Sequence, residues 1–183
     1  MEITHANLIR LVRDMTITFQ PFDEMGRARI AQLINKSSQF NLTTRRYTDP
    51  EIAEAENDPS VFTLQVRLAD IFGDNGMIST VICRTRDEGV WEIDTWLMSC
   101  RVLGRKVEHM VLREILDHAR ATGINKLIGI FKPTERNQLV VDHHAALGFI
   151  KLAEEQSGIT HWELPVECTS IASPLVRVFS QGF

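Results

Sequence analysis

Three segments rich in β-branched residues follow one another with only short turns between them, and no other feature restricts the fold of this chain as strongly. They read VFTLQVRLAD (61–70), MISTVICRTRD (77–87) and WEIDTWLMS (91–99). The first gap contains Asn75-Gly76, a strong turn signal, and the second contains Glu88-Gly89. Connections this short join antiparallel neighbours. The sequence therefore predicts a three-stranded antiparallel meander.

A strand, two short helices and a loop are expected before the meander. The strand is MTITFQ (15–20), and apolar residues at helical spacing then predict a helix from Phe22 to about residue 35. The segment 37–47 has no period and is interpreted as a loop. Thr48 and Glu51 form a capping-box signature, which predicts a second helix that ends near residue 57.

A long amphipathic helix follows the meander and ends near Gly123. Its main apolar row consists of Val107, Val111, Ile115 and Ala119. A buried strand (124–132), a helix from Thr134 to about Leu147 and a closing hairpin of FIKLAEE and ITHWELPV complete the pattern. The order β-α-α-β-β-β-α-β-α-β-β places the chain in the α+β or mixed α/β class, with a central, mostly antiparallel sheet flanked by helices.

The length and charge of the chain argue against several classes of function. The chain has 183 residues, with 20 Lys+Arg against 24 Asp+Glu, so its net charge of −4 argues against nucleic acid as a partner. No apolar run approaches the ~20 residues of a membrane-spanning helix. Three scattered cysteines and an N-terminus whose charges interrupt any signal-peptide pattern predict a cytoplasmic protein.

One domain is expected over residues 1–165, with a tail over residues 166–183. The tail is rich in apolar residues, namely Ile171, Leu175, Val176, Val178, Phe179 and Phe183. Because burying each of these groups would be favourable, we expect the tail to pack on its own domain or on a neighbouring subunit, as in a homodimer.

The stretch SCRVLGRKVEHMVL (99–112) combines a strand end, a glycine turn and a helix start. The free N–H groups and the positive end of the helix dipole favour an anion at such a junction. Arg101, Arg105 and Lys106 add positive charge to it. A phosphate-bearing ligand is one interpretation, and an ordinary turn with solvated basic residues is the other.

This arrangement resembles motif A of the GNAT superfamily of acyl-CoA N-acyltransferases, Gln/Arg-x-x-Gly-x-Gly/Ala. Arg101 and Gly104 match the motif, and Lys106 stands in place of its last small residue. The resemblance implies a fold of that family and a loop that binds the pyrophosphate of coenzyme A. The cofactor-binding residues that it implies are Leu97, Met98, Arg101, Val102, Leu103, Gly104, Arg105, Lys106, Val107 and Asn137.

A second region resembles the same family. Asn137 is followed seven positions later by His144 and then by ALGF, similar to the family pattern Asn-x6-Tyr-x3-Gly-Phe. His144 thus occupies the position of the tyrosine that protonates the departing thiolate. On one continuous helix the two residues would share a face.

A narrower resemblance connects the chain with the C-terminal GNAT-like domain of FkbH-like proteins of polyketide extender-unit biosynthesis. It rests on QLINKSSQFNLTTRRYT, VRLADIFGDNGMI and WEIDTWLMSCRVLGR. In those proteins a phosphatase-like domain with an Asp-x-Asp motif loads a glyceryl group onto an acyl carrier protein. This chain lacks that motif, so the glyceryl chemistry does not transfer to it.

Two carboxylates are candidates for the general base. Glu92 and Asp94 are two apart on one expected strand, which places them on one face with Trp96 and Met98. A partly exposed strand face is the alternative interpretation. Either carboxylate could deprotonate an acceptor amine.

The loop 37–47 supplies polar groups between the two early helices, where GNAT-like folds bind the acceptor. Its candidate substrate-binding residues are Gln39, Asn41, Thr43 and Arg45. Simple solvation of the loop is the alternative. His143 and His144 are adjacent and cannot face one metal ion as an i, i+4 pair could, so no metal is expected.

The sequence is compatible with two functions. The first is an acyltransferase that uses acetyl-CoA or another acyl-CoA, or the phosphopantetheine arm of a carrier protein, and transfers the acyl group by direct attack of an acceptor. The second is a non-catalytic GNAT-like module that docks an acyl carrier protein for a phosphatase-like partner. Arg101, Gly104 and Asn137 favour the first, and Lys106 with the missing tyrosine favours the second.

Overall fold

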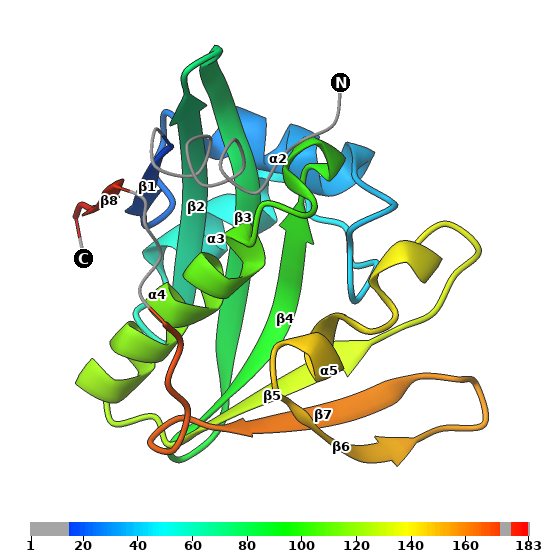
Figure 1. Ribbon diagram of the computed structural model, residues 1–183. Coiled ribbons are helices and arrows are strands. Elements are labelled where there is room, and N and C mark those ends of the chain that lie inside the picture. Colours follow the sequence, from blue (N-terminus) through cyan, green and yellow to red (C-terminus); the bar gives the residue numbers. More distant parts are fainter. Residues whose placement is uncertain (1–14, 173–176, 183) are drawn as a thin grey trace.

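The computed structural model describes residues 15–172 and 177–182, which form one sheet with helices on both faces (Figure 1). The strand order is β6-β7-β5-β4-β3-β2-β1-β8. The strands are β1 (Thr16–Gln20), β2 (Val61–Asp70), β3 (Gly73–Asp87), β4 (Val90–Met98), β5 (Lys126–Phe131), β6 (Ile150–Glu154), β7 (Thr160–Pro165) and β8 (Arg177–Ser180). The helices are α2 (Arg27–Lys36), α3 (Asp49–Asn57), α4 (Val107–Ala121) and α5 (His143–Ala146), with 3-10 turns η1 (Cys100–Val102) and η2 (Gln138–Val140).

The predicted fold class is confirmed. β4 pairs with β5, and β1 with β8, in parallel, whereas all other neighbouring strands are antiparallel. The central meander of β2, β3 and β4 is the one that the sequence predicts. Within the described residues, no helix is both long and apolar enough to cross a membrane.

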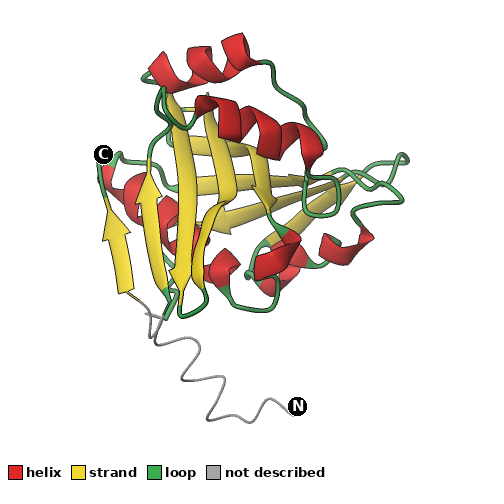
Figure 2. Cartoon of the chain, turned by 90° about the horizontal axis from the view of Figure 1, so that it is seen from above, coloured by secondary structure: helices red, strands yellow, loops and turns green. Residues whose placement is uncertain are grey.

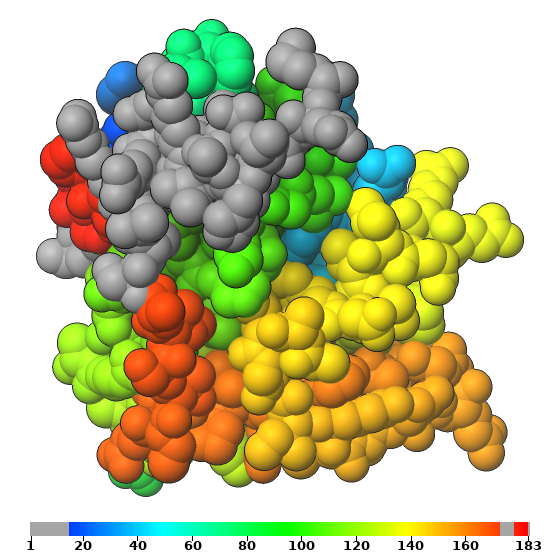
Figure 3. All heavy atoms as spheres, in the orientation of Figure 1, coloured from blue at the N-terminus to red at the C-terminus, as the bar shows by residue number. Residues whose placement is uncertain are grey.

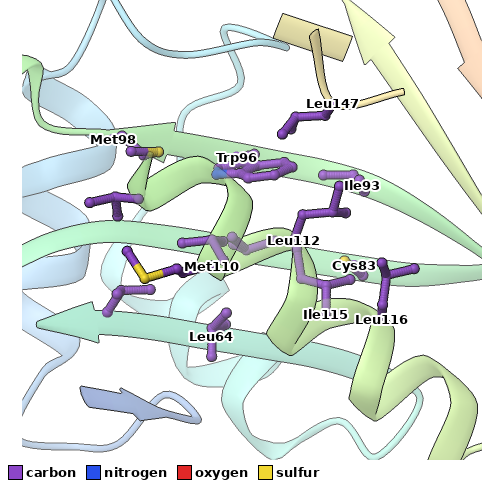
Figure 4. Close-up of a cluster of buried hydrophobic side chains, with 14 of the residues drawn as sticks. Leu64, Cys83, Ile93, Trp96, Met98, Met110, Leu112, Ile115, Leu116 and Leu147 are labelled. Carbon is purple, nitrogen blue, oxygen red and sulfur yellow. The ribbon is translucent and has the colours of Figure 1, made fainter. Parts of the chain in front are cut away.

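Helices cover the sheet on both sides (Figure 2). α4 packs on one face and α2 and α3 pack on the other, each over its own apolar cluster. The predicted row of α4 is fully buried, and Figure 4 shows neighbouring α4 side chains pointing at Leu64 and Cys83 of the sheet. Each buried side chain of this size contributes about 1.5–3 kcal/mol. The start of α4 is thereby fixed relative to the end of β4.

Two predicted boundaries are wrong. β2 and β3 pair as far as Asp70 and Gly73, so the turn lies at residues 71–72 and Asn75-Gly76 lies inside β3. The register shifts there, which the positive φ of Gly76 (67°) permits. α2 begins at Arg27 rather than near residue 22, because a turn that starts at residue 23 precedes it.

β4 contains a bulge that reverses its alternation. The β3–β4 register skips Asp94, which therefore has no partner in β3. Ile93 and Trp96 consequently both point into the cluster beneath α4, although they are three positions apart (Figure 4). The prediction that Glu92 and Asp94 share a face with Trp96 and Met98 is thus wrong.

The expected continuous helix from Thr134 to Leu147 is also wrong. The segment contains only η2 and the short α5. The Asn137 amide group is used in contacts with the preceding turn and with residues 41 and 132, and its backbone (φ −105°, ψ 18°) is not helical. These contacts outweigh the local helix preference. Asn137 and His144 therefore do not share one helix face.

The tail returns to the sheet in its described part. β8 runs parallel to β1, and the Ser180 hydroxyl donates to the Glu114 carboxylate of α4 at 2.8 Å. The prediction that the tail packs on its own domain is confirmed for residues 177–180. Val178 and Phe179 remain about half exposed, so the strand is held chiefly by its backbone. Leu175, Val176 and Phe183 lie outside the described residues.

Candidate active site

In the connection from β4 to α4, none of the residues 15–172 and 177–182 covers the side of Gly104. Gly104 has φ +77°, and a Cβ built there would meet no atom of the described residues within 4 Å. Lys106 is also left-handed, with φ 58°, and caps α4 without a side-chain hydrogen bond. The His109 N–H already donates to the Lys106 carbonyl at 3.2 Å. The N–H groups that α4 offers to an anion in front of Gly104 are therefore those of Val107 and Glu108.

The charges around this connection have different roles. Arg101 and Lys106 are exposed, whereas Arg105 donates to the Asp70 carboxylate at 2.8 Å. Burial raises the pKa of Asp70, but hydrogen bonds from Arg105, the Phe72 N–H and other neighbours outweigh it and leave that pKa below its usual value. Arg105 therefore ties the loop to β2, while Arg101 and Lys106 face solvent.

β4 and β5 pair over only part of their length. The parallel register runs from Val90 to Ile93 on β4 and from Lys126 to Gly129 on β5. Beyond these residues the strands part, and the light-blue chain of residues 40–42 passes beside β4 (Figure 1). We call residues 40–42 the inserted segment. In Figure 3 blue atoms of the early part of the chain lie between the green and the yellow surface.

The inserted segment joins both parted strands by backbone hydrogen bonds. On the β4 side, Leu42 N–H donates to Trp96 O at 3.4 Å and Met98 N–H donates to Phe40 O at 3.3 Å. On the β5 side, Lys132 N–H donates to Leu42 O at 2.8 Å. The segment therefore fills the opening as a short extra strand, and its side chains are buried.

Asn137 fastens this arrangement. Its side-chain amide donates to Asn41 O at 3.1 Å and to Lys132 O at 2.9 Å, and its oxygen accepts from Thr134 N–H at 2.7 Å. Asn137 is fully buried. The Asn137 side chain, which the sequence predicts to bind cofactor, thus already forms hydrogen bonds within the chain.

The two histidines after Asn137 are both buried, and His143 lies beside the inserted segment. The His143 ring packs edge-on against Phe40 and Trp96, with centroids 5.0 and 4.6 Å away. His144 stacks on Trp162, and its two ring nitrogens have no hydrogen-bond partner among the described residues.

Burial sets the charge of both rings. It lowers the pKa of His144 to about 4. It also holds the pKa of His143 well below its usual value, with a smaller contribution from the charge of His144. His144 is therefore neutral at neutral pH, a property that the sequence does not reveal.

Asp94 lies in a dense polar cluster. Its carboxylate accepts from Arg45, from the Tyr47 hydroxyl and, at 3.0 Å, from the Thr95 hydroxyl, and Arg84 lies 3.8 Å away. Burial, followed by the contact with Asp94, raises the pKa of Tyr47 to about 12, so the phenol stays protonated.

The sequence predicts Asp94 and Arg45 but misses Tyr47 and Arg84. Tyr47 is the only tyrosine of the chain and follows two arginines, which was the available signal. Glu92 stands apart from this cluster and pairs with Arg86 at 3.1 Å.

A polar cavity of about 360 Å³ opens beside the inserted segment. Its lining residues are Ser38, Asn41, Thr44, Arg46, Thr134, Glu135 and Arg136. Of the four predicted substrate residues, only Asn41 lines it. Gln39 is exposed, Thr43 donates to the backbone of Asp94 at 2.8 Å, and Arg45 belongs to the Asp94 cluster. The described residues contain no group of side chains that could hold a metal ion.

Solved structures share this architecture. The ribosomal-protein-S18-alanine N-acetyltransferase from Escherichia coli superposes with a TM-score of 0.60 at 9% identity, over 84% of this chain and 96% of that one. The GNAT domain of S. lividans PAT gives 0.63 at 16% identity, over 80% and 89%. The chain has the GNAT fold. A third GNAT-fold neighbour is spermidine N-acetyltransferase from Vibrio cholerae in complex with CoA and spermine, with a TM-score of 0.61 at 11% identity, over 82% and 96%.

No protein-family model and no curated protein sequence matches the chain. The likeness to the solved GNAT structures therefore concerns the fold.

The GNAT fold raises the question of whether coenzyme A suits the residues present. The phosphate end of coenzyme A suits them. Among the described residues no atom lies against Gly104 and no side chain caps α4, and Arg101 and Lys106 are exposed. These residues would hold the pyrophosphate, and a bound acyl-CoA would supply an activated thioester.

Proposed function

We propose that this protein is an acyltransferase that takes an acyl group from acyl-CoA, or from the phosphopantetheine thioester of a carrier protein. The observation that carries the proposal is the open glycine connection before α4, with Arg101 and Lys106 beside it, in a chain of GNAT fold. We place the protein in the reducing cytoplasm, where exposed thiols such as those of Cys100 and Cys168 stay free.

The proposed transfer is a direct attack by the acceptor on the thioester carbonyl. Asp94 or Glu92 would accept the acceptor's proton. His144 would return a proton to the departing sulfur from its imidazolium form, so its neutral ring must take up a proton before the C–S bond breaks. The Asp94 oxygens already accept hydrogen bonds from Arg45 and Tyr47. Asp94 can therefore accept the acceptor's proton only if the acceptor replaces one of these two donors. The Glu92 side chain is more exposed, and Arg86 is its single ion-pair partner among the residues that the structure describes.

The polar cavity is the proposed place of the acceptor. Its volume of about 360 Å³ lies in the range of small-molecule sites. Arg136 has no side-chain partner among the described residues, and Arg46 already donates to the carbonyls of Ile34 and Ser37. The lining thus offers a free guanidinium and several hydroxyls to a polar acceptor.

A pair of glycine variants tests the phosphate loop. Gly104 and Gly123 lie at opposite ends of α4 and have φ of 77° and 76°, and a Cβ at either would touch no atom in the described part of the chain. Valine at either position should cost stability on the order of 1–2 kcal/mol, because both backbones are left-handed. Only Gly104→Val should lose CoA affinity, by about tenfold or more, in calorimetry. A folded Gly104→Val protein with undiminished affinity would overturn the loop assignment.

His144→Phe tests the proposed proton donor. We expect turnover to fall by roughly 10² while CoA affinity stays nearly constant, because phenylalanine keeps an aromatic ring beside Trp162 but carries no proton. Equal turnover in the two proteins would remove His144 from the reaction and leave it a role in the core.

A second candidate function is a non-catalytic module that docks an acyl carrier protein for a phosphatase-like partner, as the resemblance to FkbH-like proteins suggests. One observation favours it: two of the three candidate proton-transfer groups are already engaged or buried. Asp94 is held by Arg45, and His144 is 1% exposed. Carrier-protein binding without any acyl transfer from several acyl-CoAs would support this candidate over the first.

A further inference from the structure

The opening between β4 and β5 would be the natural channel for a thioester arm. Strands that part leave backbone N–H and C=O groups on their facing edges, and an extended amide-bearing chain can pair with such an edge. Here β4 continues for five residues beyond Ile93, from Asp94 to Met98, towards the proposed phosphate loop. An arm that starts at that loop would therefore run along this edge of β4.

The inserted segment already uses this edge. The Trp96 carbonyl and the Met98 N–H bond to residues 42 and 40, and Asn41 forms a bridge with Leu97. Phe40 and Leu42 are 3% and 1% exposed, so the described residues leave no open channel beside these two side chains.

We propose that residues 40–42 are a built-in occupant of the thioester-arm channel, so that the segment and the arm exclude each other. The proposal rests on the proposed function. The phosphate end of an acyl-CoA would bind with the segment in place, whereas the arm would be admitted only after the segment withdraws.

Unpartnered polar atoms around the segment support this assignment. Trp96 Nε1 and His143 Nε2 are buried and have no hydrogen-bond partner among the described residues. The Trp96 and His143 rings pack against each other, and the His143 ring also packs against Phe40. A buried polar atom without a partner is costly, and the apolar Phe40 ring cannot supply one. An arm with amide groups could.

The attachment of the segment is compatible with withdrawal. Its two bonds to β4 are long, at 3.3 and 3.4 Å. The bonds from Lys132 N–H to Leu42 O and from the Asn137 amide to Asn41 O are shorter, at 2.8 and 3.1 Å. Thr44, two residues beyond the segment, has φ 60°, which is unfavourable for a β-branched residue. Release of this strain would offset part of the cost of moving the segment.

Two ligands separate the inference from the proposed function. The fragment 3′-phosphoadenosine 5′-diphosphate carries the phosphates of CoA but lacks the arm. In calorimetry we expect wild-type protein to bind the fragment. Phe40→Ala should bind CoA about tenfold more tightly than wild type, with unchanged fragment affinity, because apparent affinity scales with the fraction of molecules whose channel is open.

Phe22→Ala is the matched control, since Phe22 is 4% exposed but packs in the cluster on the other face of the sheet. It should change neither affinity. Fragment binding with equal CoA affinity in wild type and Phe40→Ala would overturn the inference alone. Failure of the fragment to bind would overturn the phosphate loop, and the inference with it.

Hydrogen exchange on wild-type protein gives a test that needs no variant. Saturating CoA, but not the fragment, should speed exchange of the Leu42 and Lys132 amides by about tenfold or more, because both N–H groups are bonded through the segment. Unchanged or greater protection of these amides with CoA bound would contradict the proposal, even if Phe40→Ala failed to fold.

Discussion

Gly129 shows how a single missing side chain positions a candidate catalytic group. A Cβ added there would overlap the His144 ring. We therefore expect Gly129→Ala to lower the free energy of unfolding by about 1–3 kcal/mol, the usual cost of overfilling a core. The quantity to measure is the urea dependence of unfolding.

A double-mutant cycle distinguishes this overlap from a general loss of strand stability. His144→Ala removes the ring and leaves space for the new methyl group. The double variant should thus be more stable than the sum of the two single effects, by about 1 kcal/mol or more. Strict additivity would show that Gly129 and His144 do not constrain each other.

The residues of the candidate site differ in how far the sequence predicts them. Arg101 and Gly104 are found because a strand end, a glycine and a helix start are adjacent in the chain. The Asp94 cluster is assembled by contacts across strands and by a bulge, neither of which has a local signal. The burial of His144 depends on Trp162 and is likewise invisible in local sequence.

At the scale of elements, segments with strong local patterns are predicted correctly. The capping box at Thr48 and Glu51 forms as expected, and the apolar row of α4 is buried. The segment 134–147 was predicted wrongly because Asn137 bonds to a loop nearly a hundred residues earlier in the chain. The sequence of the inserted segment has no strand pattern. Its extended backbone is held by hydrogen bonds to the strands on either side, which local sequence does not reveal.

Deletion of residues 170–183 tests the contribution of β8. The strand pairs with β1 and donates to Glu114, but its side chains Val178 and Phe179 are about half exposed. We expect a loss of about 1–2 kcal/mol, which lowers Tm by roughly 2–8 °C in a protein of this size. A truncated protein with the Tm of the full chain would show that β8 adds no stability.

At the scale of the whole molecule, the stability should depend on pH through the two buried histidines. The pKa of His144 falls from 6.5 to about 4 on burial, so the unfolded chain binds more protons than the folded one between these values. The free energy of unfolding should thus be highest above about pH 6.5 and fall towards about pH 4, by on the order of 3 kcal/mol for His144. His143 adds to the loss in the same direction.

Denaturation with urea at several pH values between these limits measures the effect. His144→Phe cannot take up a proton and should reduce the dependence to the part that His143 contributes. A wild-type free energy of unfolding that stays constant from about pH 6.5 to about pH 4 would show that the rings are not buried in their neutral form. Because His143 packs against Phe40, a variant that loosens the inserted segment should also reduce the dependence, by giving that ring access to water.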